Sequence, residues 1–148
     1  MDEGRIAHLM RDAKGGAVRY TQCDAATRFD AVQVLVLDTM GMLSSVYGSA
    51  TWAYVGGGFG VGIHNTLEAA TFGLPIAFGP NYGKFKEARD MVSLGCAVSV
   101  RTAGELAAWF APLRDDEETL RRASRTAKDY TARNQGATGI ILRSIFNS

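Results

Sequence analysis

Glycine residues gathered just before a histidine and an asparagine suit the binding of an anion. The glycines are Gly56, Gly57, Gly58, Gly60 and Gly62, and they lead into His64 and Asn65. A glycine loop ahead of a helix presents unpaired backbone N–H groups and the positive end of the helix dipole, where a phosphate fits. The spacing differs from the dinucleotide-binding fingerprint, so a bare tight turn remains the alternative. We favour a phosphate-binding loop, because five glycines and two polar residues meet at one helix start.

The residues on either side of this loop predict one βαβ unit that positions it. Residues 52–55 form a short apolar run typical of a buried parallel strand. Asn65 is a suitable N-cap with Glu68 at the capping-box position, which predicts a helix from about Asn65 to Gly73. A second apolar strand is predicted at residues 75–78. The loop is therefore expected at the carboxyl end of a strand.

The rest of the chain continues the alternation of strands and helices. The predicted strands are 17–21, 31–37 and 97–100, and the predicted helices are 2–14, 41–49, 84–94 and one capped by Thr102 and Glu105. The run 31–37 is the richest in β-formers and is expected to be a buried strand ending at Asp38. After Pro112 only helices are expected, with Gly136 separating the last one. This order predicts a doubly wound α/β domain, whose ligands lie beyond the carboxyl ends of its strands.

Composition excludes several classes of function. The 148 residues predict one domain, and 16 Lys and Arg against 15 Asp and Glu leave a charge of +1, which gives no electrostatic case for nucleic acid. Cys23 and Cys96 lack metal-ligand spacing. No Asp-x-Asp pair or histidine cluster is present, so neither a metal nor a cofactor is expected. No run of 18 apolar residues and no signal peptide appear, which predicts a soluble fragment. The charges between Asp115 and Lys128 are interpreted as a solvated helix face.

Four motifs in order resemble the Kdo transferases, the glycosyltransferases that move 3-deoxy-D-manno-octulosonic acid (Kdo) from CMP onto lipid A precursors. The stretch GGGFGVGIHNTLEAATFGLPIAFGP resembles their donor-site motif. Residues 38–41 resemble the family's Asp-Thr-x-Gly, 85–87 its Asn-Phe-Lys-Glu, and 134–137 its Asn-Gln-Gly-Ala. The resemblance spans about residues 33–146 and corresponds to the later part of a family member. Ile63 stands where a glycine is usual and Met42 where Glu is common.

This resemblance implies the carboxyl half of a GT-B type glycosyltransferase, with a Rossmann-like sheet truncated at its start. Residues 1–148 would be part of the domain that binds CMP-Kdo. The missing amino half would carry the acceptor site for the lipid A precursor, the catalytic carboxylate and the association with the cytoplasmic face of the bacterial inner membrane. The parent enzyme would act in lipopolysaccharide biosynthesis. The fragment itself is expected to contain no catalytic residue and to be inactive.

The resemblance also implies roles for individual residues in donor binding. The loop of Gly56, Gly57, Gly58 and Phe59 would hold the CMP phosphate, helped by Asn65 at the helix start. His64 would donate a hydrogen bond to the sugar or phosphate, or it is only an exposed residue beside the cap.

Three further positions have a structural alternative beside the binding role. Glu68 would accept hydrogen bonds from the ribose hydroxyls, or it only closes the capping box. Asp38, Thr39 and Met40 would contact the base or sugar, or they form a helix N-cap. Lys86 would pair with the phosphate, or it is solvated.

Two other functions and one oligomeric state follow as expectations. A UDP-sugar transferase or epimerase of the same two-domain plan is one alternative, and a non-catalytic nucleotide-binding or assembly module is another. Opening strands missing between 32–37 and 52–55 would leave an unpaired apolar edge. Self-association or a rearranged sheet is therefore predicted for the fragment.

Overall fold

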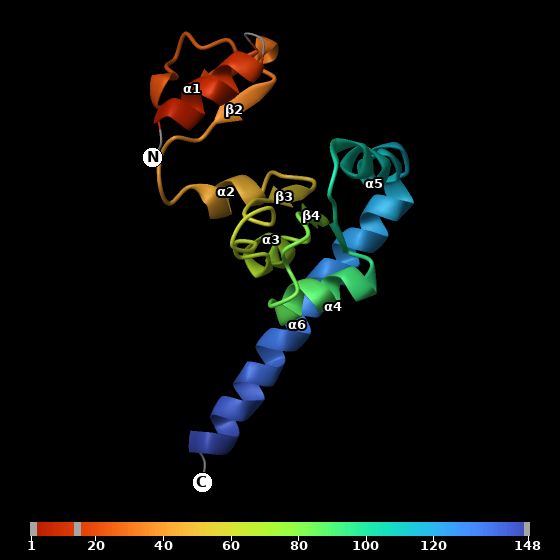
Figure 1. Ribbon diagram of the computed structural model, residues 1–148. Helices are drawn as coiled ribbons and strands as arrows, with labels where there is room; N and C mark the ends of the chain where they lie inside the picture. Colours follow the sequence, from red (N-terminus) through yellow and green to blue (C-terminus); the bar gives the residue numbers. More distant parts are fainter. Residues whose placement is uncertain (1–2, 14–15, 147–148) are drawn as a thin grey trace. The chain divides into compact units, whose positions relative to one another are not determined.

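The computed structural model describes residues 3–13 and 16–146, with side chains described as far as residue 134. The chain divides into two compact units, Met1–Leu43 and Ser44–Ser148. Figure 1 shows the first unit in red and orange and the second from yellow to blue. Each unit combines helices with strands that pair in parallel, as the alternating sequence pattern predicts.

The described part of the first unit contains one α-helix, two short 3-10 helices, η1 (Tyr20–Gln22) and η2 (Phe29–Ala31), and a two-stranded sheet. Helix α1 (Glu3–Asp12) precedes strand β1 (Ala17–Arg19), which pairs in parallel with β2 (Val34–Val36). The prediction of a buried strand over 31–37 is wrong in its burial, because Val34 and Leu35 are 41% and 43% exposed. Within this unit β2 has a single neighbouring strand, so its apolar side chains lack the cover that a central parallel strand receives.

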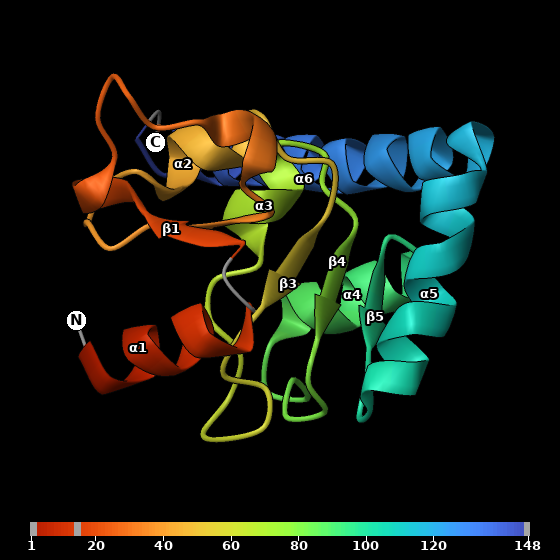
Figure 2. The same ribbon diagram turned by 90° about the horizontal axis from the view of Figure 1, so that it is seen from above.

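The second unit is built on a three-stranded parallel sheet. Its strands are β3 (Ala53–Val55), β4 (Ile76–Phe78) and β5 (Ala97–Ser99). Strand β4 lies between the other two, as Figure 2 shows. The helices are α2 (Leu43–Tyr47), which spans the boundary between the units, α3 (Leu67–Thr71), α4 (Lys86–Leu94), α5 (Ala103–Asp115) and α6 (Glu117–Phe146). The carboxyl ends of all three strands consequently meet at one edge of the sheet.

The core of this unit lies on one face of the sheet. Ile76 and Phe78 of β4 are fully buried and pack with Met91 of α4 and Ala127 of α6. For the predicted strand 52–55, burial holds at Val55 of β3 but is wrong for Tyr54 of β3 and for Trp52 just before it, which are 49% and 42% exposed. These two residues lie toward the other face of the sheet. There the Trp52 ring packs edge-on against the Phe110 ring of α5, with 4.4 Å between the ring centroids.

Predicted helix ends were right where a cap forms locally. Thr102 accepts a hydrogen bond from the Glu105 N–H at 3.1 Å at the start of α5, and Gly95 ends α4 at φ +80°. The predicted break at Gly136 is wrong, because α6 is one continuous helix (Figure 1). A single glycine costs about 1 kcal/mol inside a helix, too little to end one of 30 residues. No helix among the described residues has the length and apolar character needed to cross a membrane.

Candidate functional site

The glycine loop follows the carboxyl end of β3, as predicted, and is closed by hydrogen bonds of its own. The Gly57 carbonyl accepts from the N–H groups of Gly60 and Gly62, at 2.9 and 3.3 Å. The His64 N–H donates to the Gly56 carbonyl at 3.2 Å. Among the described residues, no protein acceptor receives the N–H groups of Gly57 and Phe59. Among the described residues the N–H groups of Gly58 and Val61 also lack a protein acceptor, but Gly58 is buried, so the exposed donors at Gly57 and Phe59 are the ones that we consider for an anion.

Two glycines of the loop are required by close backbone approaches. Gly57 has φ +90°, and a Cβ built on it would lie 2.3 Å from the Gly62 carbonyl oxygen. Gly58 is buried, and a Cβ there would lie 2.5 Å from the Gly79 nitrogen. Backbone packed this tightly leaves no room for a side chain at either position. The glycines thus shape the loop in addition to exposing its N–H groups.

A second loop, residues 79–85 after β4, is tied to the glycine loop. Asn81 donates its N–H to the Gly58 carbonyl at 2.9 Å and its side-chain amide to the Gly60 carbonyl at 2.7 Å. The Phe85 ring lies against Gly62, where a Cβ would come within 3.0 Å of it. Two of the predicted motifs, the glycine loop and residues 85–87, are thereby brought together. Asn81 was missed by the sequence analysis, since an asparagine after Gly-Pro is also ordinary turn chemistry.

A cavity of about 390 Å³ lies where these two loops meet. Its lining residues are Gly60, Val61, Pro80, Asn81, Gly83 and Lys84. Val61 is fully exposed and Phe59 is 60% exposed, while Ile63 is 5% exposed and packs in the core. The isoleucine that departs from the family's glycine pattern therefore anchors the base of the loop, and Phe59 stays open to solvent.

The predicted capping box at the start of α3 is wrong. Helix α3 begins at Leu67 after Thr66, and the Asn65 side-chain oxygen accepts from the Leu67 N–H at 3.0 Å in a local turn. His64 and Asn65 are both exposed, and the His64 ring lies close to Gly57. The helix is only five residues long, so the loop N–H groups provide more of the site than the helix dipole does.

Glu68 contacts α2 instead of closing the capping box. Its carboxylate accepts a hydrogen bond from the Ser44 hydroxyl at 2.6 Å. Burial and then the negative charge of Glu68 raise the pKa of Tyr47 above its ordinary value. The capping alternative for Glu68 is therefore excluded, and its predicted role at the ribose stays a prediction.

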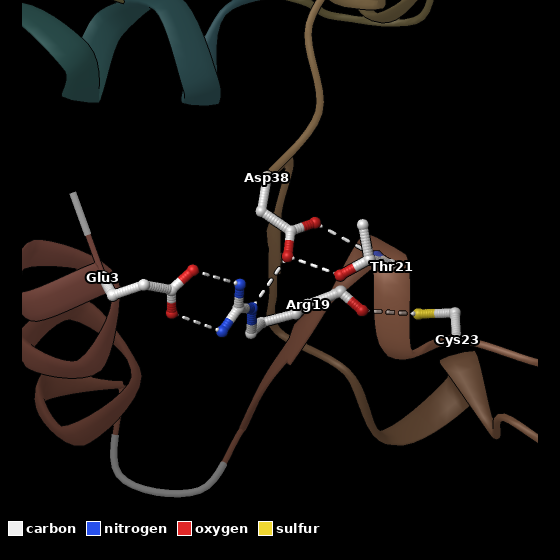
Figure 3. Close-up of polar contacts among 5 residues, drawn as sticks. All are labelled: Glu3, Arg19, Thr21, Cys23 and Asp38. Atoms are coloured by element: carbon white, nitrogen blue, oxygen red, sulfur yellow. Dashed lines mark hydrogen bonds and ion pairs between the residues drawn. The ribbon is translucent and has the colours of Figure 1, made fainter. Parts of the chain in front are cut away.

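Asp38 is held by side chains of its own unit, which Figure 3 shows. Its carboxylate accepts from the Thr21 N–H at 3.0 Å and from the Thr21 hydroxyl at 2.5 Å. Arg19 donates to it at 2.7 Å and also pairs with Glu3 at 2.8 Å. The Thr21 hydroxyl and then the Arg19 guanidinium hold the pKa of Asp38 well below its usual range. The Asp38 side chain is 1% exposed, and its hydrogen bonds fix the position of the chain after β2.

The helix N-cap alternative for residues 38–40 is wrong, since α2 begins at Leu43 and Asp38 accepts from Thr21 and Arg19. Met40 is 92% exposed, and the Thr39 hydroxyl donates to the Met42 sulfur at 3.1 Å. Arg19 was missed by the sequence analysis. Its position in β1, in register with Val36 two residues before Asp38, becomes evident only when the two strands are paired.

Lys86 forms an ion pair within α4, which competes with its predicted role as a phosphate ligand. Its ammonium lies 2.5 Å from the Asp90 carboxylate, which also accepts from the Tyr130 hydroxyl of α6 at 2.9 Å. In the part of the chain that the structure describes, no three His, Cys, Asp or Glu side chains gather as a metal site would require. The groups that the structure brings together at the two loops are therefore backbone N–H groups of the glycine loop and the side-chain amide of Asn81.

Comparison with a solved structure defines the fold. The chain is similar to the C-terminal CMP-Kdo binding domain of WaaA from Acinetobacter baumannii, with a TM-score of 0.71 and 22% identity over 86% of this chain and 66% of that one. The α/β fold with parallel strands predicted from the sequence is thus confirmed, and it is the fold of that C-terminal domain. No protein-family model matches the chain.

Curated relatives then identify the family. The 3-deoxy-D-manno-octulosonic acid transferase of Bordetella pertussis is 34% identical over 77% of this chain and 27% of its own length. Enzymes of the same name from Rickettsia bellii and Chlamydia muridarum are 28% and 40% identical, over 68% and 51% of this chain and 25% and 17% of their own lengths. The chain is a relative of the 3-deoxy-D-manno-octulosonic acid transferases, which confirms the family resemblance. It spans about a quarter of the length of the first two.

Proposed function

We propose that this chain binds CMP-Kdo as part of the donor domain of a Kdo transferase. The observation that carries the proposal is the glycine loop at the carboxyl end of β3, which Asn81 ties to the next loop. Its Gly57 and Phe59 N–H groups have no acceptor among the described residues and can therefore meet a phosphate. The similarity to a CMP-Kdo binding domain and to curated Kdo transferases supports the same function.

Each remaining residue of the site has a role in this proposal. The N–H groups of the Gly56–Phe59 loop hold the CMP phosphate and stabilise it as the leaving group through oriented backbone dipoles. Glu68 accepts from the ribose hydroxyls, and His64 and Asn65 donate to the phosphate or sugar. Thr39 and Met40 contact the base or sugar, and Asp38 holds that segment in place.

The activity of the whole protein is part of the proposal as well. A parent enzyme of this family would transfer Kdo to a lipid A precursor at the cytoplasmic face of the inner membrane, in lipopolysaccharide biosynthesis. The acceptor site and the catalytic carboxylate would lie in an amino half, so residues 1–148 alone would bind the donor without transferring it. The similarity to a C-terminal CMP-Kdo binding domain, together with a match to about a quarter of the curated relatives' length, supports the proposal that this chain is only the donor-binding part.

We also propose that residues 1–148 self-associate through the apolar face of β3. Trp52 and Tyr54 are exposed there and line, with Leu106 and Phe110 of α5, an apolar cavity of about 290 Å³. An exposed apolar patch beside an open sheet edge favours association. Sedimentation velocity from 10 to 500 µM is expected to show a concentration-dependent increase in mass that Tyr54→Lys reduces. A monomer throughout this range would contradict the proposal.

Amide NMR titrations of the chain with CMP and with UDP test the donor proposal. CMP is expected to shift the signals of residues 56–68, and Glu68→Ala to weaken the binding by removing the ribose contact. Ser44→Ala is the matched control, because it removes the hydrogen bond to Glu68 and keeps the carboxylate. Preference for UDP would favour a UDP-sugar enzyme, and binding of neither nucleotide would favour a non-catalytic module.

A further inference from the structure

We propose that Lys84 supplies the positive charge that pairs with the phosphate of the bound nucleotide. This inference rests on the proposed function and adds to it a residue that the sequence analysis did not select. In the resembled family segment, Asn-Phe-Lys-Glu, an asparagine stands where this chain has Lys84. The residue is therefore a difference between this chain and that motif.

Lys84 lines the cavity where the two loops of the site meet. It shares this cavity with Gly60 and Val61 of the glycine loop and with Asn81, whose amide binds the Gly60 carbonyl. The free N–H groups of Gly57 and Phe59 belong to the same glycine loop. Gly57 and Phe59 do not line the cavity, but the Gly60 N–H donates to the Gly57 carbonyl at 2.9 Å, so the cavity and the donors share one loop. We infer that the long, flexible Lys84 side chain reaches a phosphate held there.

The other cations of this segment already have partners. Lys86 pairs with Asp90 at 2.5 Å, and Arg89 donates to the Gly83 carbonyl at 3.0 Å. Among the described residues, Lys84 forms no hydrogen bond or ion pair, and its side chain is exposed. The N–H donors of the loop are neutral, so the unpaired Lys84 ammonium would supply the full positive charge that a bound phosphate needs.

The backbone on both sides of Lys84 is fixed, which gives the side chain a defined origin. The Phe85 N–H donates to the Tyr82 carbonyl at 2.9 Å, and the Phe85 ring lies against Gly62. Arg89 fastens the Gly83 carbonyl on the other side. The segment therefore loses little backbone entropy when a ligand binds, so the lysine charge contributes with a small ordering cost.

The expected change in CMP affinity follows from the solvent exposure of the ion pair between Lys84 and the phosphate. Free CMP carries close to two negative charges at neutral pH, whereas the glycine loop offers only partial positive charges. A solvent-exposed ion pair changes affinity by up to about fivefold, and salt weakens it. Lys84→Gln is therefore expected to weaken CMP binding by about three- to fivefold at low salt, and by less in 0.5 M NaCl.

Four forms of the chain and two ligands test this inference by NMR titration. Lys84→Gln is expected to weaken CMP binding and to leave cytidine binding unchanged, because cytidine has no phosphate. Lys84→Arg, which keeps the charge, is expected to restore most of the affinity. Lys86→Gln is the matched control on the same segment and is expected to bind CMP as the wild type does.

Each outcome decides between the proposals. CMP binding by Lys84→Gln equal to that of the wild type overturns the inference and leaves the proposed function standing. Equal losses in Lys84→Gln and Lys86→Gln also overturn it, since they would reflect net charge alone. If the wild type binds neither CMP nor cytidine, the proposed function fails and the inference falls with it.

Discussion

Gly58→Ala is expected to destabilise the second unit and to separate the two loops of the site. A Cβ at position 58 would lie 2.5 Å from the nitrogen and 2.6 Å from the Cα of Gly79, closer than non-bonded atoms can approach. Because both partners are backbone, no side-chain rotation relieves the clash. The loops must move apart, which breaks the hydrogen bond from the Asn81 N–H to the Gly58 carbonyl.

The magnitude follows from this geometry. Forcing an extra methyl into closely packed structure costs about 1–3 kcal/mol, and the loss of one hydrogen bond places Gly58→Ala toward the upper part of this range. A cost of about 2 kcal/mol corresponds to a fall in Tm of about 4–8 °C for a chain near this size. The matched control is Gly60→Ala in the same loop, where the nearest atom would be 3.7 Å away. That substitution is expected to be neutral or stabilising by about 0.5 kcal/mol.

Tryptophan fluorescence during urea unfolding measures this difference. Trp52 and Trp109 are the two tryptophans of the chain and both belong to the second unit, so the signal reports on the unit that carries the loop. CMP titrations of the same variants are expected to show weakened binding for Gly58→Ala alone. Equal stability of Gly58→Ala and Gly60→Ala would refute the close approach of Gly58 and Gly79.

Three further predictions concern titratable groups. Glu68→Gln is expected to lower the pKa of Tyr47 toward its ordinary value, as an ultraviolet titration would measure. The pKa should return only by the smaller part of its shift, because burial is the larger cause. The lowered pKa of Asp38 means that its contribution to stability is present above pH 3.8 and is lost as the pH falls below it. Acid titration by NMR should show this loss in the first unit, and Asp38→Asn should abolish it. Burial raises the pKa of the Cys96 thiol to about 11, so iodoacetamide at pH 8 is expected to label Cys23 first, which mass spectrometry would detect.

Local motifs allowed accurate predictions where neighbouring residues decide the structure. The cap formed by Thr102 and Glu105 was predicted because a hydroxyl and an N–H three residues apart meet whenever a helix starts there. The glycine loop after β3 was predicted for a similar reason, since positive φ and close backbone contact need glycine. The predicted capping box at Asn65 does not form, because the Glu68 carboxylate binds the Ser44 hydroxyl, a partner distant in sequence, instead of the local N–H group.

Burial was harder to predict than the strands themselves. The runs 31–37 and 52–55 have the composition of buried strands, and each contains a strand of three residues. Val34, Leu35, Trp52 and Tyr54 are nevertheless exposed, since burial depends on how many neighbours a strand receives in its own unit. Composition describes the strand, whereas the number of its neighbours is a property of the assembled sheet.

The sequence by itself determined the family, the parallel α/β class and the position of the glycine loop, because these depend on residue types at fixed spacing. Only the tertiary structure decided which partners the polar side chains choose. Asp38 binds Arg19 across 19 residues, and Glu68 binds Ser44 across 24. The same packing pairs Lys86 with Asp90, whereas Lys84 has no polar partner in the part of the chain that the structure describes. Such choices depend on which segments lie side by side after folding, and no local spacing encodes that proximity.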